Sequence, residues 1–260
     1  MSDRATPDNR TRARDASGVT HLHFARAPGA VAIDRRSAPC AAAVELAIER
    51  DLFDAMVDSP ERLRLWQPLP ALIATAAEAG RPAFAQAAAR SHARGLPVHV
   101  RPSGGGAVSM GPGSLVVSHF YRSFRSDIDW SYRQFAGLLK AAVAALHVTL
   151  CEQHVVGAYC DGRFDLAWQS HKVGGIAQRR RWRDGVAHVW IHAVLAVEAE
   201  ALGYPEAVRD FYADLGSPRI ADPRRTTTIS HCLPGQAGVG DLMSRLGDAI
   251  VRVFTDERAS

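Results

Sequence analysis

The chain is poor in cysteine, carries little net charge and has no long apolar run. Its four cysteines show no C-x-x-C spacing, so neither a metal site such as zinc nor a redox dithiol is expected. A net charge of +4 over 260 residues gives no electrostatic reason for a nucleic-acid partner. No apolar run reaches the ~18 residues of a membrane-spanning helix, so no membrane partner is expected.

The N-terminal residues 1–19 mix Arg and Asp with Thr, Ser and Pro and lack the apolar core of a secretory signal. This composition is typical of a disordered tail. The few thiols and the missing signal together predict a cytoplasmic protein. From about residue 20 to residue 256 neither a linker nor a repeat divides the chain. Because 47% of the chain is hydrophobic, we expect one globular domain there.

Helical and extended patterns are mixed along this domain. The clearest helix covers residues 132–146, where apolar residues recur at i, i+3, i+4, i+7, i+8 and i+11. Asp184 and Gly185 form a strong turn signal between two strands. Other helices are predicted over 41–57, 82–94 and 241–254, and strands over 63–68, 97–100, 114–121, 163–169, 172–178 and 186–197. Helices mixed with antiparallel strands indicate an α+β fold.

Two glycine-rich segments carry the chemistry. The first is RPSGGGAV, residues 101–108, and the second is GAYCDGRFDLAWQSHKVGGIAQRRR, residues 157–181. Gly104, Gly105 and Gly106 remove all side chains from one stretch, so a ligand can lie directly on the backbone. The same holds for Gly174 and Gly175, just after Lys172. Together the segments indicate a site that holds an activated acyl group, with one thiol and one amine over it.

These segments resemble the lipoyl/octanoyl attachment superfamily, which contains lipoate-protein ligases, octanoyltransferases and, more distantly, biotin-protein ligases. RPSGGGAV is similar to that family's glycine loop, and HKVGGIAQRR to its lysine element. GAYCDGRFDL resembles the Gly-Ser-Tyr-Cys-x-Gly-x-Tyr-Asp-Leu pattern of the cysteine-dependent amidotransferase branch. The resemblance implies a biotin/lipoate-protein-ligase-like catalytic domain, with a mainly antiparallel sheet flanked by helices. It also implies that Cys160 is the nucleophile and Lys172 the family's lysine.

A cysteine can hold an acyl group as a thioester and so split one difficult transfer into two steps. A nearby cation favours the reactive thiolate, and Lys172, twelve residues after Cys160, is the candidate. It can also serve as general base and stabilise the oxyanion. Backbone amides of Gly174 and Gly175, or of the Gly104–Gly106 loop, can donate to the same oxygen.

Two other functions remain open. One is an ATP-dependent lipoate-protein ligase, which would need ATP and Mg²⁺, whereas the transferase requires no cofactor. Residues 109–113, SMGPG, and 191–197, IHAVLAV, depart from the ligase patterns His-Asp and His-Gly-Thr-Leu. The chain lacks a G-x-x-x-x-G-K-[ST] loop, but this superfamily binds nucleotides without one. The other function is a non-catalytic acyl-binding module.

The expected acyl acceptors are lipoyl domains of 2-oxoacid dehydrogenases or the glycine cleavage H protein, and acyl carrier protein is a further candidate partner. The arginine cluster Arg179, Arg180, Arg181 and Arg183 is either a docking patch at a hairpin tip or a solvated loop. Asp165 is expected to be structural, and His188 and His192 to share one face of a strand. His21 and His23 give only a weak metal signal. Trp66, Leu115 and Tyr159 are candidates for lining an acyl tunnel.

Overall fold

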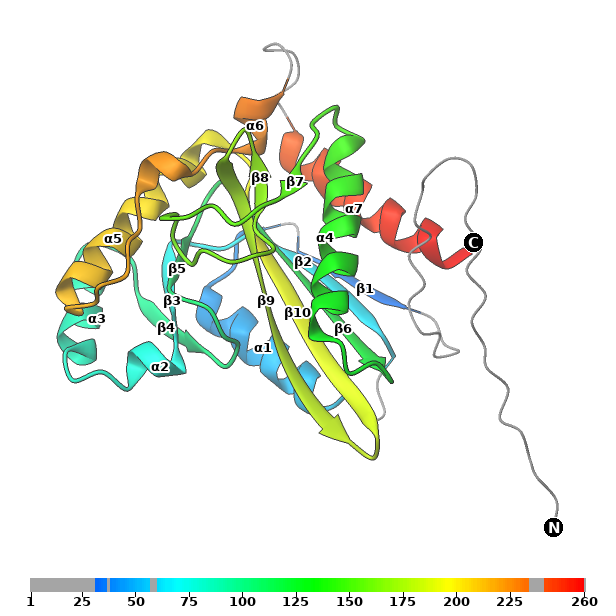
Figure 1. Ribbon diagram of the computed structural model, residues 1–260, viewed down its shortest axis with the longest axis horizontal. Helices are drawn as coiled ribbons and strands as arrows, with labels where there is room; N and C mark the ends of the chain where they lie inside the picture. The colour runs from blue at the N-terminus through cyan, green and yellow to red at the C-terminus, as the bar shows by residue number, and fades with distance from the viewer. Residues whose placement is uncertain (1–30, 37, 57–59, 234–240, 260) are drawn as a thin grey trace.

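The computed structural model describes residues 31–36, 38–56, 60–233 and 241–259. The predicted tail over residues 1–19, together with His21 and His23, lies outside these residues. Two sheets and their covering helices make up the described part (Figure 1). The predicted α+β architecture with a mainly antiparallel sheet is confirmed.

The large sheet has seven strands in the order β1-β2-β6-β10-β9-β8-β7. Each neighbouring pair is antiparallel except β1–β2, which is parallel. Its strands are β1 Ala32–Arg35, β2 Arg62–Trp66, β6 Ser114–Ser123, β7 Cys151–Glu152, β8 Leu166–Trp168, β9 His171–Arg183 and β10 Val186–Ala196. The small sheet has the order β4-β3-β5, with β3 Ala71–Thr75, β4 Val98–Arg101 and β5 Val108–Met110.

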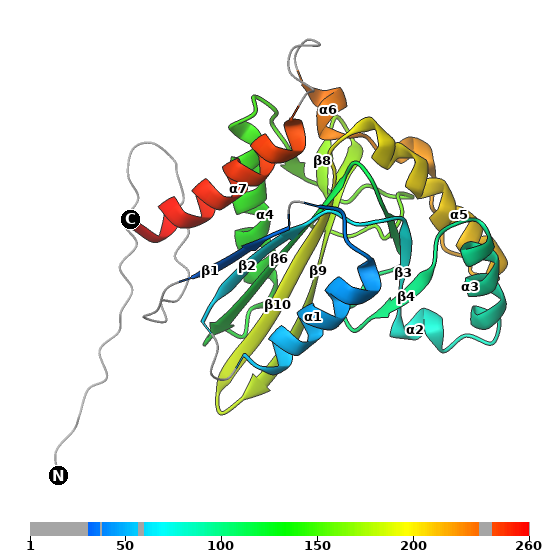
Figure 2. The same cartoon turned by 180° about the vertical axis from the view of Figure 1, so that it is seen from behind.

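Helices α4 and α7 cover one face of the large sheet and α1 covers the other (Figures 1 and 2). Residues of β10 alternate between these faces, because successive side chains of a strand point in opposite directions. Val189 and Ile191 lie in the core with α4 and α7, whereas Trp190 packs on Phe53 of α1. The helices are α1 Ala42–Asp54, α2 Ala76–Ala79, α3 Phe84–Ala93, α4 Ile128–Ala144, α5 Tyr204–Asp214, α6 Ile229–Cys232 and α7 Leu242–Ala259.

Helix α4 confirms the predicted apolar stripe, since Phe135, Leu138, Leu139 and Ala142 are all buried. Its first residue follows Asp127, whose side chain accepts a hydrogen bond from the backbone of Trp130 and so caps the helix. Within the described residues, no helix is long and apolar enough to cross a bilayer.

The β9–β10 hairpin corrects the prediction for the arginine cluster. Asp184 and Gly185 form the turn, with φ values of 50° and 76° that suit a two-residue hairpin loop. However, β9 continues to Arg183 instead of ending at Gln178, because its later residues pair with β10 from Trp190 to Val186. The four arginines therefore lie in a paired strand and not in a loop at the hairpin tip.

Candidate functional site

Cys160 lies in a tight turn between the two sheets. The turn contains Gly157 with φ 84° and Cys160 itself with φ 45°. A residue other than glycine in the left-handed region is uncommon, and such residues concentrate at functional sites. The turn directs the half-buried thiol at the glycine loop, where the backbone N–H of Gly106 donates to Cys160 Sγ at 3.1 Å.

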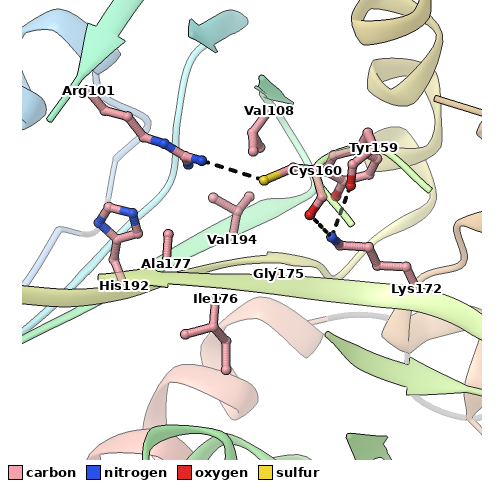
Figure 3. Close-up of a pocket in the computed structure, with 10 residues that line it drawn as sticks. All are labelled: Arg101, Val108, Tyr159, Cys160, Lys172, Gly175, Ile176, Ala177, His192 and Val194. Atoms are coloured by element: carbon pink, nitrogen blue, oxygen red, sulfur yellow. Dashed lines mark hydrogen bonds between the residues drawn. The ribbon is translucent and has the colours of Figure 1, made fainter. Parts of the chain in front are cut away.

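The cation hydrogen-bonded to this thiol is Arg101, the last residue of β4. Its Nη2 lies 3.6 Å from Cys160 Sγ, and Figure 3 shows the two side chains pointing toward each other. The same nitrogen donates to the carbonyl oxygens of Gly104 and Gly106 at 3.0 and 2.9 Å. Arg101 is buried, so it shapes the loop and places positive charge beside the sulfur. Sequence reasoning assigned this position to Lys172, although Arg101 opens the glycine motif and could have been considered.

Lys172 contacts the backbone of Cys160 and not its thiol. The fully buried Nζ donates to the carbonyl oxygens of Tyr159 and Cys160 at 3.0 and 2.8 Å, and to Asp165 Oδ1 at 2.8 Å. These three acceptors engage the three N–H groups of the lysine side chain. Lys172 therefore fixes the turn that holds Cys160.

Asp165 is the buried counterion of Lys172. Burial raises the pKa of its carboxyl, and the charge of Lys172 and a hydrogen bond from Lys172 oppose that rise. The second oxygen of the carboxylate accepts from the backbone N–H of Gly162 at 3.0 Å. Asp165 thus ties the turn after Cys160 to the start of β9, which is consistent with the structural role expected of it.

Two of the predicted glycines bring the loop against Cys160. Gly105 has φ 101°, and a β-carbon there would lie 2.9 Å from Cys160 Sγ. A β-carbon at Gly106 would collide with Arg219 Nη1 and with Tyr212 Oη. Only glycine allows the loop to run this close to the thiol. The close approach of the loop to the thiol therefore requires glycine for two reasons, the positive φ at Gly105 and the lack of space for a β-carbon.

The other predicted glycines differ in their surroundings. A β-carbon at Gly175 would lie 2.9 Å from Lys172 Nζ, so this glycine makes room for the lysine. Gly174 instead packs against β10, where a β-carbon would lie 2.6 Å from Leu195 Cδ2. A β-carbon at Gly104 would meet nothing within 4 Å. Among the five glycines, Gly105, Gly106 and Gly175 thus adjoin Cys160 or Lys172.

The glycine loop is anchored by the layer of helices behind it. The backbone N–H of Ala107 lies 3.0 Å from Glu78 Oε1 and 2.8 Å from Tyr212 Oη. Burial and the Glu78 carboxylate raise the pKa of Tyr212, which keeps its phenol neutral. Helices α2 and α5 therefore hold the loop in register with Cys160.

A small pocket lies behind the thiol, between the two sheets. Val108 of β5 and Val194 of β10 give it an apolar wall, and Tyr159 closes one side (Figure 3). Its full lining is Arg101, Val108, Tyr159, Cys160, Lys172, Gly175, Ile176, Ala177, His192 and Val194. Of the three tunnel candidates, Tyr159 lines this pocket. Trp66 and Leu115 are buried in the hydrophobic cores and do not line the pocket.

His192 is a pocket residue that sequence reasoning did not select. Its Nε2 is hydrogen-bonded to Ser103 Oγ at 3.2 Å. Burial, together with the charge of Arg101, lowers the pKa of His192 to about 3, so its imidazole is neutral at pH 7. The alternation of side chains along β10 gave a usable signal for His192, because it places His192 on the same face as Val194, which forms the pocket wall. Within the described residues, no group of three or more His, Cys, Asp or Glu is arranged to hold a metal ion.

The fold and the glycine loop define a class of acyl-attachment enzymes, and comparison with known proteins agrees. The chain belongs to the lipoyl protein ligase A/B catalytic domain family, whose model matches residues 41–251. It is 31% identical over 243 residues to an uncharacterized protein of Cupriavidus necator, covering 85% of this chain and 94% of that one. It is 32% identical over 198 residues to an octanoyl-[GcvH]:protein N-octanoyltransferase of Anoxybacillus flavithermus, covering 72% of this chain and 70% of the relative.

Solved structures share the fold at low sequence identity. Lipoate-protein ligase A bound with ATP superposes with a TM-score of 0.66 and 16% identity, over 89% of this chain and 85% of that one. A lipoate protein ligase of Thermoplasma acidophilum with bound lipoic acid gives a TM-score of 0.65 and 15% identity, over 89% and 86% of the two chains. At such low sequence identity, these two comparisons establish only that the fold is shared.

Proposed function

We propose that this chain is an acyltransferase that moves an octanoyl or lipoyl group, through a thioester on Cys160, to a lysine of a carrier domain. The observation that carries the proposal is the position of the Cys160 thiol between the Arg101 guanidinium and the Gly106 N–H. Relatives named octanoyl-[GcvH]:protein N-octanoyltransferase and lipoyl-[GcvH]:protein N-lipoyltransferase support it.

In the first step the Cys160 thiolate attacks the carbonyl carbon of the acyl donor. Arg101 and the Gly106 N–H stabilise the negative sulfur, since charge-assisted hydrogen bonds favour the charged form. A carbon–sulfur bond forms, the bond to the donor's amine or thiol breaks, and the proton released by Cys160 leaves with the donor. The acyl chain then lies against Gly105 and the apolar wall of Val108 and Val194.

Lys172 acts in this scheme through its charge and its hold on the turn. Its ammonium is engaged by Asp165 and two carbonyls, so it is poorly placed to accept a proton. We assign it to positioning Cys160 and, through its charge and not through a hydrogen bond, to stabilising the oxyanion. This differs from the general-base role expected from the sequence.

The acceptor would be a lipoyl domain of a 2-oxoacid dehydrogenase or the glycine cleavage H protein, and acyl carrier protein would be an alternative donor. Transfer through a thioester requires no cofactor. An ATP-dependent ligase acting through an acyl-adenylate would instead need ATP and Mg²⁺. The requirement for ATP therefore separates the two activities.

The test is an incubation with an octanoylated carrier and an apo-carrier, with and without ATP, followed by intact-mass spectrometry. The protein should gain one acyl mass that neutral hydroxylamine removes, and the apo-carrier should become acylated without ATP. Cys160→Ser should abolish or greatly slow both events, while Cys151→Ser, at an exposed cysteine, should match wild type. Normal turnover by Cys160→Ser, or acylation of the apo-carrier only when free octanoate with ATP and Mg²⁺ replaces the octanoylated carrier, would favour the ligase function.

A further inference from the structure

Cys160 also lines a second pocket, which is open to solvent. We call this pocket the mouth; it is lined by Gly105, Val156, Cys160, Asp161, Arg219 and Ile220, with Gly157, Tyr212 and Pro218 between them. Most of its lining comes from two segments, the turn that carries Cys160 and the loop that follows α5, and Gly105 and Tyr212 complete it. The backbone N–H of Asp222 donates to the carbonyl of Gly157 at 2.8 Å and joins these segments.

Two large aliphatic side chains stand exposed on the rim of the mouth. Val156 is 69% exposed and Ile220 is 71% exposed, one on each of the two joined segments. Single exposed aliphatics are ordinary, but here two of them line the same pocket as Cys160. Both side chains gain stabilisation only when another molecule covers them.

The charges of the mouth are divided between its two sides. Asp161 follows the nucleophile, and its carboxylate lies 3.2 Å from His154 Nε2. Arg219 lies over the glycine loop and donates to the carbonyl of Gly105 at 3.2 Å. A protein lysine arrives as an ammonium, so it is attracted to the Asp161 side and repelled by Arg219.

The arginine cluster on β9 is less suited to this docking role, because three of its four members are engaged within the chain. Arg180 donates to the carbonyl oxygens of Arg125 and Ser126 and to Ser131 Oγ. Arg179 donates to the carbonyl of Pro102, and Arg181 pairs with Asp54.

We propose that the mouth is the docking surface for the folded carrier domain that presents the acceptor lysine. Val156 and Ile220 contact apolar side chains that flank this lysine, and Asp161 draws its ammonium toward the acyl thioester. The lysine nitrogen then bonds to the acyl carbon and the carbon–sulfur bond breaks. Of the two protons that the ammonium loses, one returns to the Cys160 sulfur and one passes to solvent. This proposal rests on the proposed function.

The experiment measures the two half-reactions separately in Val156→Glu, Ile220→Glu and a control. Acylation of Cys160 is measured with the octanoyl thioester of N-acetylcysteamine, and transfer with apo-glycine cleavage H protein. The matched control is Phe124→Glu, because Phe124 is a comparably exposed apolar residue, at 76%. It follows the end of β6 that pairs with the hairpin end of β10, whereas Gly174 and Gly175 pair with the opposite end of β10. A lysine derivative, Nα-acetyl-lysine amide, serves as an acceptor too small to reach the rim.

Transfer to the carrier should fall about tenfold or more in kcat/KM for each mouth variant, as for a contact residue at the centre of an interface. Acylation, and transfer to the small acceptor, should stay within about twofold of wild type, as for surface substitutions. Carrier transfer by the mouth variants equal to that of Phe124→Glu would overturn the proposal. So would an equal loss in both half-reactions. Failure of wild type to acylate Cys160 would instead refute the proposed function itself, and the docking proposal with it.

Discussion

At the scale of single residues, the Lys172–Asp165 pair links the chemistry to the stability of the fold. Lys172→Met would leave the buried Asp165 carboxyl without its cation, which should cost about 3–5 kcal/mol in the free energy of unfolding. Because burial already raises the pKa of Asp165, stability in this variant should fall further as the pH rises above the unfolded value of about 4. Urea denaturation at pH 4 and pH 7 measures both effects.

The double variant Lys172→Met/Asp165→Asn separates the two roles of Lys172. The amide at position 165 removes the unpaired charge and can still accept from Gly162, so most of the lost stability should return. If Lys172 also stabilises the oxyanion, the acylation rate of the folded double variant should remain ~10²-fold below wild type. A stable double variant with normal acylation would remove Lys172 from the chemistry.

The buried His192 should make the stability of the folded protein depend on pH. Its pKa is about 3 in the folded chain and near 6.5 when unfolded, so the unfolded chain takes up a proton first as the pH falls. The stabilisation is therefore fully present above pH 6.5 and is lost on descending toward pH 3. Between pH 7 and pH 5 wild type should lose about 2 kcal/mol more than His192→Gln. Equal losses in urea titrations of the two proteins would contradict this.

At the scale of elements, the glycine loop offers a matched pair of substitutions. Gly105→Ala places a β-carbon against Cys160 Sγ at a positive φ, so it should both destabilise the loop and slow acylation. Gly104→Ala meets nothing within 4 Å and should change neither quantity strongly. Unfolding free energy and acylation rate, measured on one sample of each variant, test the difference. A loss of similar size in Gly104→Ala would mean that the loop needs glycine for its flexibility alone.

The elements also show which parts of the fold sequence reasoning could reach. Helix α4 was predictable because its apolar period is local, and the β9–β10 turn because Asp184-Gly185 specifies it. Helix α2 was missed, since four residues carry too little periodicity and its capping box, Thr75 with Glu78, is the only local sign. The extension of β9 to Arg183 depends on pairing with β10, which no local pattern encodes.

The same limit applies to the site. Cys160, Lys172 and the loop glycines could be predicted from their motifs. Arg101 and His192 each had a local signal, but their position at the thiol pocket could not be predicted, because it depends on packing of the small sheet on the large one. Asp165 lies near Lys172 in sequence, yet its ion pair depends on how the turn after Cys160 folds back on β9.

At the scale of the whole molecule, the site exists only where the two sheets meet. Arg101 and Val108 come from the small sheet, and Lys172, His192 and Val194 from the large one. The Cys160 turn closes the space between them, and the mouth opens outward from that turn. With the proposed transfer through Cys160, the donor carrier and the acceptor carrier would use the same mouth, one after the other.

This arrangement predicts ping-pong kinetics for the full reaction. Double-reciprocal plots of rate against donor, at several acceptor concentrations, should be parallel, and excess acceptor should inhibit by competing with the donor for the mouth. Without any acceptor, labelled apo-donor should exchange into acylated donor, because the first half-reaction is reversible and complete in itself. Cys160→Ser should lose this exchange. Intersecting lines without exchange would indicate that donor and acceptor bind together, which a single thioester reached through one mouth does not allow.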